Sequence, residues 1–119
     1  MKSNRRVLVV APHADVAETV VGWLTSQGHE TRLVTDFVSA KPELDAHPPD
    51  LLVTEIKLGA FNGLHLAIRA HSQCTRTSTI VIGDADNALE REAFEQHASY
   101  VRQPQLATMF ADTARAVLG

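Results

Sequence analysis

The chain has 119 residues, of which 45% are hydrophobic and 21% charged, and its formal net charge is −3. This length suits one domain with a single core, and a weakly acidic chain has no general attraction to nucleic acid or anionic lipid. The apolar run at 7–11 is too short for a signal peptide or a membrane span, and the single cysteine, Cys74, has no disulfide partner. We therefore expect one cytoplasmic domain, residues 1–119, that binds neither nucleic acid nor membrane.

Apolar runs alternate with amphipathic stretches along the chain. Residues 6–11, which contain the apolar run 7–11, predict a buried parallel strand, and the helical spacing that follows ends at Gly28. Residues 30–35 predict a second strand, less buried because it contains Glu30 and Arg32. Residues 38–46 predict a weaker helix, which we expect to begin near Pro42 or to kink there, because proline lacks an amide donor.

The second half of the chain continues the alternation. Residues 50–56 predict a third strand, 57–63 a loop, and the next segment a helix. Residues 78–83 predict a fourth strand, 87–98 a helix, 99–103 a fifth strand and 106–118 a final helix. This order predicts an α/β fold, a doubly wound five-stranded parallel sheet with five helices. Ligands bind such sheets at the carboxyl ends of the strands, so residues 11–13, 55–57, 82–84 and 103 are of most interest.

The first of these ends reads VVAPHADVAE, residues 9–18, and resembles the opening of the zinc-dependent de-N-acetylases. That resemblance would make His13 a zinc ligand and Asp15 the general base of a small metal-dependent hydrolase. The second ligand position holds Val16, however, and a catalytic zinc generally needs three protein ligands. We keep this hydrolase as the alternative. The simpler interpretation is a capping box of Asp15 with Glu18 at the start of the first helix, and His13 in an exposed turn.

A longer resemblance lies in the centre of the chain, which reads HPPDLLVTEIKLGAFNGLHL at 47–66. It resembles the response-regulator receiver domain, the two-component module typified by the bacterial chemotaxis regulator, whose pattern there is P-D-L-V-L-L-D-I-x-L-P-G-x-[DN]-G-L. Residues 98–104, ASYVRQP, resemble the family's fifth strand, where an aromatic residue precedes a Lys-Pro pair by three positions. The resemblance spans essentially the whole chain and implies a flavodoxin-like receiver architecture.

The receiver family transfers a phosphoryl group from a histidine kinase to an Asp at the end of the third strand. Two acids after the first strand, the acceptor Asp and a nearby carbonyl hold Mg²⁺, while a Thr or Ser and a Lys bind the phosphoryl oxygens. By resemblance, these positions fall on residues of other types: Ala11 and Pro12 for the acid pair, Glu55 for the acceptor, Lys57 for the carbonyl, Ile82 or Gly83 for the hydroxyl, and Gln103 for the Lys.

This set is unsuited to phosphoryl transfer. One carboxylate and one carbonyl make a poor Mg²⁺ site, and without the metal and the Lys nothing offsets the charge on the transferred group. Glu55 is also one methylene longer than Asp, which misplaces its oxygens for in-line attack. We therefore expect no enzymatic activity, no metal and no cofactor. We expect Glu55 to be a polar remnant pointing at water, with mimicry of a phosphorylated Asp as the open alternative.

Two aromatic residues are candidates for a protein-binding surface. By resemblance, Tyr100 occupies the family's aromatic switch position, which reports to the surface formed by 87–98, 99–103 and 106–118; it is equally a half-buried anchor of an edge strand. Phe61 is an exposed contact if its loop is open, or it closes over the pocket. The sequence thus predicts a pseudo-receiver, a phosphorylation-independent interaction or regulatory module in signal transduction, which binds a protein partner or forms a homodimer.

Two further points stay open at the level of sequence. The chain is also compatible with a regulatory domain cut from a longer protein. The receiver resemblance implies that the bond between Gln103 and Pro104 is cis, because the corresponding Lys-Pro bond of the family is typically cis. In that geometry, we expect Gln103 to face Glu55.

Overall fold

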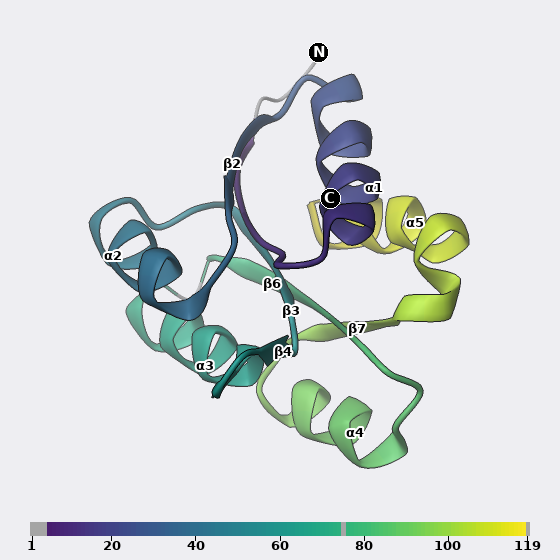
Figure 1. Cartoon of the computed structure of the whole chain (residues 1–119). Helices are drawn as coiled ribbons and strands as arrows, with labels where there is room; N and C mark the ends of the chain where they lie inside the picture. Colours follow the sequence, from purple (N-terminus) through teal and green to yellow (C-terminus); the bar gives the residue numbers. More distant parts are fainter. Residues whose placement is uncertain (1–4, 75, 119) are drawn as a thin grey trace.

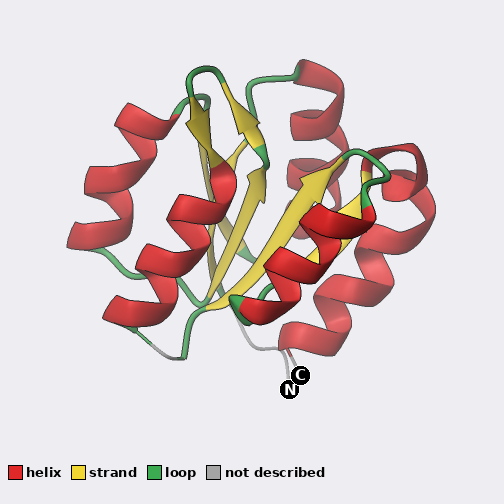
Figure 2. Ribbon diagram, turned by 90° about the horizontal axis from the view of Figure 1, so that it is seen from below, coloured by secondary structure: helices red, strands yellow, loops and turns green. Residues whose placement is uncertain are grey.

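The computed structural model describes residues 5–74 and 76–118, which form a parallel sheet with helices on both faces (Figure 1, Figure 2). The five strands of the sheet are hydrogen-bonded in the order β2-β1-β3-β6-β7. These strands are β1 (Arg6–Val10), β2 (Glu30–Val34), β3 (Leu51–Glu55), β6 (Ser78–Gly83) and β7 (Ser99–Arg102). The helices are α1 (Ala14–Ser26), α2 (Phe37–Ala46), α3 (Gly63–Gln73), α4 (Asn87–Glu95) and α5 (Leu106–Leu118). The expected doubly wound α/β fold is confirmed.

The sheet separates two hydrophobic layers. Alternate residues of β1, β3 and β6 point to opposite faces, because successive side chains of a strand do so. Val7, Val9 and Ile80 pack against α1 and α5, while Leu8 and Leu52 pack under α2 and α3. In Figure 1, α1 and α5 lie on one side of the sheet and α2, α3 and α4 on the other. The three central strands are buried on both faces, which explains their continuous apolar runs.

The chain direction across the sheet reverses at β1. The first crossover goes from β1 to β2 on one side, and the later strands are added beyond β3 on the other side. The carboxyl ends of β1 and β3 therefore flank the topological switch point, where open α/β sheets form a crevice. The two edges of the sheet are β2, in which Glu30 and Arg32 are exposed as expected, and β7.

Helix α2 corrects one expectation. It begins at Phe37 and contains Pro42, so the expectation that the helix would begin near the proline was wrong. The Asp36 carboxylate caps the helix by accepting a hydrogen bond from Ser39 N at 2.7 Å. Ala40 and Leu44 are buried against the sheet. Capping and burial together offset the local cost of the proline.

Replacing this proline is expected to stabilise the protein. Pro42 is exposed and lacks the N–H that would donate to the carbonyl of Val38. Pro42→Ala restores that donor, although the unfolded chain also gains freedom, so the free energy of unfolding should rise by about 2 kcal/mol. Urea denaturation of the two proteins measures the difference. A decrease would show that the ring of Pro42 makes a favourable contact.

The start of α1 and the loop after β3 also differ from expectation. His13 is the N-cap residue of α1, with no side-chain cap hydrogen bond, so the proposed capping box of Asp15 with Glu18 was wrong. Asp15 lies inside the first turn, where a negative charge complements the helix dipole.

The loop after β3 contains a short antiparallel hairpin of β4 (Lys57–Leu58) and β5 (Phe61–Asn62). Gly59, at its turn, has a φ of 65°.

The connection from β7 to α5 is a single 3-10 turn, η1 (Gln103–Gln105). The bond between Gln103 and Pro104 is trans, so the expected cis bond was wrong. Pro104 lies at the start of the 3-10 turn, where a proline is tolerated, and the turn leads directly into α5. Gln103 is exposed.

Within the described residues, no helix has the length and apolar character needed to cross a bilayer.

Candidate functional site

A buried carboxylate and an exposed imidazole meet where β1 and β3 end. The backbone N–H of His13 donates to Glu55 Oε2 at 3.0 Å, and His13 Nδ1 lies 2.7 Å from Glu55 Oε1. Glu55 is only 4% exposed, whereas the His13 side chain is 60% exposed. The expectation that Glu55 points at water was therefore wrong. Both of its oxygens are bonded to a residue that follows β1 by three positions.

The electrostatics of this pair follow from the burial of Glu55. A carboxylate removed from water is costly unless donors or an opposite charge compensate it. His13 supplies two donors and, when protonated, a positive charge. The hydrogen bond with Glu55 raises the pKa of His13 above 6.5; the charges of Glu55 and, less strongly, Asp15 also raise it, while desolvation of the ring opposes them. Below that pKa, the two side chains form an ion pair.

The stability that this pair contributes is expected to depend on pH. Because the pKa of His13 is raised by folding, the folded protein binds this proton more tightly than the unfolded chain. The contribution is therefore fully present below about pH 6.5 and is lost as the pH rises through the raised pKa. Urea unfolding between about pH 6 and pH 9 measures this loss. Glu55→Gln is expected to remove most of it, and an unchanged pH profile in that variant would contradict the assignment.

Tyr100 lies with its hydroxyl at the end of β6. The hydroxyl donates to the carbonyl of Asp84 at 2.7 Å. A Cβ at Gly83 would lie 2.3 Å from this oxygen, so the tyrosine fills space that a side chain at 83 would need. Burial, together with the charges of Asp84, Glu90 and Asp86, raises the pKa of Tyr100 to about 12. Of the two candidate hydroxyl positions, Gly83 is thus the one beside Tyr100, while Ile82 is buried in the core beneath α1 and α5.

The structure does not pair Gln103 with Glu55 as expected, and Phe61 packs on another aromatic ring. The Phe61 ring is stacked on Phe37 at the start of α2, with centroids 4.5 Å apart, and Phe61 remains 46% exposed. Neither residue forms a hydrogen bond with the carboxylate in the part of the chain that the structure describes. Gln103 instead lines a neighbouring cavity of about 440 Å³, together with Asp15, Val16, Thr19, Asp84, Pro104, Leu106 and Ala107.

Other side chains at this edge of the sheet are bonded elsewhere. Ala11 is buried in the core and Pro12 is exposed. Lys57 Nζ lies 3.1 Å from Asp84 Oδ2, but both side chains are largely exposed, and such pairs contribute little to stability. Lys57 and Asp84 thus link the hairpin after β3 to the loop after β6.

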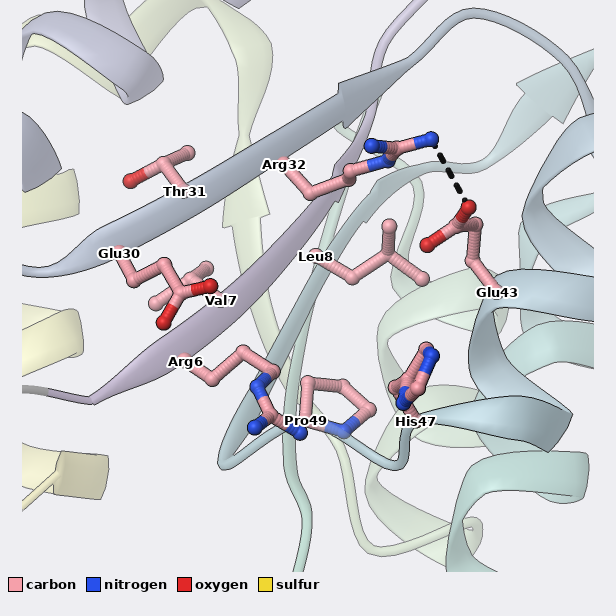
Figure 3. Close-up of a pocket in the computed structure, with 9 residues that line it drawn as sticks. All are labelled: Arg6, Val7, Leu8, Glu30, Thr31, Arg32, Glu43, His47 and Pro49. Carbon is pink, nitrogen blue, oxygen red and sulfur yellow. Dashed lines mark ion pairs between the residues drawn. The ribbon is translucent and has the colours of Figure 1, made fainter.

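A second cavity, of about 410 Å³, lies at the opposite end of the strands, between β1, β2 and the end of α2 (Figure 3). Its walls combine apolar and charged side chains: Arg6, Val7, Leu8, Glu30, Thr31, Arg32, Glu43, His47 and Pro49. Arg32 Nη2 lies 2.9 Å from Glu43 Oε2, so an ion pair joins the edge strand to α2 across this cavity. Charged side chains of β2 therefore line this cavity beneath α2. It shares no residue with the site around Glu55.

Solved structures resemble this chain closely in backbone. A receiver domain protein from Methanospirillum hungatei matches with a TM-score of 0.86 and 18% identity, over 98% of this chain and 94% of that one. A response regulator from Chloroflexus aurantiacus gives a TM-score of 0.85 and 20% identity, over 98% of both chains. NtrX from Brucella abortus gives 0.84 and 26%, over 98% of this chain and 27% of that one.

The chain has the receiver fold. No protein-family model matches it. Among curated proteins, the Regulator of RpoS from Escherichia coli K12 is 27% identical over 84 residues, which is 71% of this chain. The chain spans about a quarter of the length of that relative. The matched proteins are named as receiver domains, response regulators and a regulator of RpoS, and nothing among these similarities supports the hydrolase alternative.

The divalent metal that the receiver resemblance implies does not fit this site. Ala11 and Pro12 offer no carboxylate, and both oxygens of Glu55 are already bonded to His13. Within the described residues, no three His, Cys, Asp or Glu side chains come together in a way that could hold a metal ion. Mg²⁺ needs several oxygen ligands in near-octahedral geometry. The residues at this edge therefore do not form a Mg²⁺ site.

The pairing of His13 with Glu55 is the feature that the sequence analysis missed. The two residues were treated separately, His13 in the hydrolase motif and Glu55 in the receiver motif. A signal was available, because His13 follows β1, Glu55 ends β3, and these two strands are neighbours in a doubly wound sheet, so both residues lie at the same edge.

Proposed function

We propose that this chain is a cytoplasmic, phosphorylation-independent regulatory module in signal transduction that acts by binding a protein partner. The proposal rests on the hydrogen bonds that occupy both carboxylate oxygens of Glu55, which stands at the acceptor position of the receiver pattern. A carboxylate that is buried and bonded through both oxygens is not free to attack a phosphodonor in line. With Gln103 in place of a Lys, the site also lacks a positive group to bind the phosphoryl oxygens.

The proposed partner surface is formed by α4, β7 and α5, with Tyr100 at its centre. β7 is an edge strand, and α4 and α5 pack on either side of it. Phe94 on α4 is 80% exposed and Met109 on α5 is 46% exposed. Large exposed apolar side chains are candidate contacts for a protein partner. The curated relative is named as a regulator, which also supports a protein as the target.

Chemical inertness is the expected result that tests the proposal most directly. Incubation with acetyl phosphate and Mg²⁺ should leave the intact mass of the protein unchanged, because neither the metal site nor the acceptor is available. An active receiver domain in the same mixture serves as the control for the donor. A stoichiometric gain of one phosphoryl group that Glu55→Gln abolishes would overturn the proposal.

The partner surface is tested by capture from the native host with wild-type protein and with Phe94→Ser as the surface variant. A partner that binds wild type, binds the variant more weakly and is indifferent to acetyl phosphate agrees with the proposal. Phe61→Ser is the matched control, since Phe61 lies outside this surface. Analytical ultracentrifugation of the same proteins shows whether the partner is a second copy of the chain.

A further inference from the structure

Glu55 has an unusual charge environment for a carboxylate at the end of a central strand. It is buried, and no Lys or Arg side chain forms an ion pair with it among the described residues. Its one charged partner is His13, a residue whose positive charge depends on a bound proton. The His13 ring is exposed, so protons exchange between it and water.

The two hydrogen bonds to Glu55 also hold a piece of backbone. One donor is the ring and the other is the main-chain N–H of His13, the N-cap residue of α1. His13 O in turn accepts from Ala17 N at 3.0 Å, the first turn of the helix. The same residue therefore fixes the entry to α1 and covers the end of β3.

We propose that the His13 imidazolium is the built-in cation of this site, standing where the receiver pattern would place a divalent metal. Protonation of His13 holds the turn between β1 and α1, residues 11–13, against Glu55, and we call this turn the clasp. The inference builds on the proposed function, which leaves the Glu55 pocket without phosphoryl chemistry. Its ligand is the proton itself.

Loss of the proton changes the balance at Glu55. With His13 protonated, the buried carboxylate has a full opposite charge 2.7 Å away, and charge-assisted hydrogen bonds are about twice as strong as neutral ones. With His13 neutral, the carboxylate stays buried but has only neutral donors. The clasp is then weaker, and the backbone at 12–15 opens more often.

The other charged groups at this edge of the sheet do not replace His13. Asp15 adds to the preference of the ring for its proton. Asp36, after β2, is engaged as the cap of α2, and Lys57 is paired with Asp84. The charged groups on the surrounding elements are therefore Asp15 on α1, Asp36 after β2, Lys57 on β4 and Asp84 after β6.

Nuclear magnetic resonance of the whole chain tests the clasp. The His13 ring signals, assigned with His13→Gln, are followed from about pH 5 to pH 9 together with the exchange of the amides at 13–15, corrected for intrinsic rates. We expect His13 to titrate above 6.5 and the protection of these amides to fall several-fold with the same midpoint. In Glu55→Gln, the midpoint should move down toward 6.5, and in His13→Gln the protection should be independent of pH.

His47→Gln is the matched control, because His47 is an exposed histidine at the opposite end of the strands, and it should leave the exchange profile unchanged. Two results would overturn the clasp. One is protection of the amides at 13–15 that does not change when His13 is protonated, and the other is a shift of the Glu55 signals when MgCl₂ is added to wild-type protein. Failure of the clasp with an unchanged mass in acetyl phosphate would leave the proposed function standing. A gain in mass would remove the proposed function, whatever the exchange data show.

Discussion

Gly63→Ala is expected to destabilise the protein by about 3 kcal/mol, the upper end of the range of about 1–3 kcal/mol that overpacking typically costs, because the site is rigid. A Cβ on Gly63 would lie 2.1 Å from the carbonyl oxygen of Glu55 and 3.0 Å from Thr54 Oγ1. The clash is with the backbone of a central strand, which cannot rotate away as a side chain can. Gly63 N also donates to Ile56 O at 2.7 Å, so the start of α3 is held close to the end of β3.

Gly22→Ala is the matched control for Gly63→Ala. Gly22 lies on the exposed side of α1, with no heavy atom within 4 Å of an added Cβ. There the same substitution should stabilise the protein by about 1 kcal/mol, because alanine is the better helix former. Urea denaturation of the two variants should therefore give shifts of opposite sign. A stable Gly63→Ala protein would mean that the end of β3 is free to move, which would also weaken the case for a rigidly held Glu55.

Gly83→Thr is expected to expel Tyr100 from its place at the end of β6. A Cβ at this position would lie 2.3 Å from the tyrosine oxygen and 2.9 Å from Ile56 Cγ2. The tyrosine hydroxyl is the far end of a side chain, so rotation of Tyr100 relieves the clash at the cost of its hydrogen bond to Asp84 O. Once outside, the phenol is solvated, and its pKa should fall from about 12 toward 10.

The absorbance of the phenolate measures this change without ambiguity, because Tyr100 is the single tyrosine of the chain. Circular dichroism at each pH confirms that the protein is still folded. Gly22→Thr adds the same side chain in open space and should leave the titration of Tyr100 unaltered. If Gly83→Thr also titrates near 12, the threonine is accommodated by the backbone and the tyrosine is not held by the absence of a side chain at 83.

The strands were the most predictable part of the fold. β1 and β6 are buried on both faces along most of their length, so each contains a run of apolar residues, and their positions were predicted to within one residue. Helix α2 was predicted less well, since its start depends on the Asp36 cap and on burial of Ala40 and Leu44 rather than on local preference. The β4–β5 hairpin contributes only two residues to each strand, too few for a periodic pattern.

The site was predictable in position but not in geometry. Placing the interesting residues at the carboxyl ends of the strands followed from the strand order alone. The orientation of Glu55 did not, because its partner His13 lies 42 positions away in the sequence. The trans bond before Pro104 was missed for a related reason: it depends on how the 3-10 turn joins α5, which the receiver resemblance does not specify.

The charged edge strand β2 has a consequence for how copies of this chain meet. An uncovered strand edge is a template for pairing with another molecule, and charged side chains on it discourage such pairing. Exposed Glu30 and Arg32, with Arg32 tied to Glu43, make sheet extension on this side electrostatically unfavourable. The opposite edge, β7, is only four residues long and is flanked by the exposed apolar Phe94 and Met109. Aggregation through β2 should therefore be rare. The β7 edge, with apolar side chains beside it, is the edge that favours contact with a neighbouring molecule.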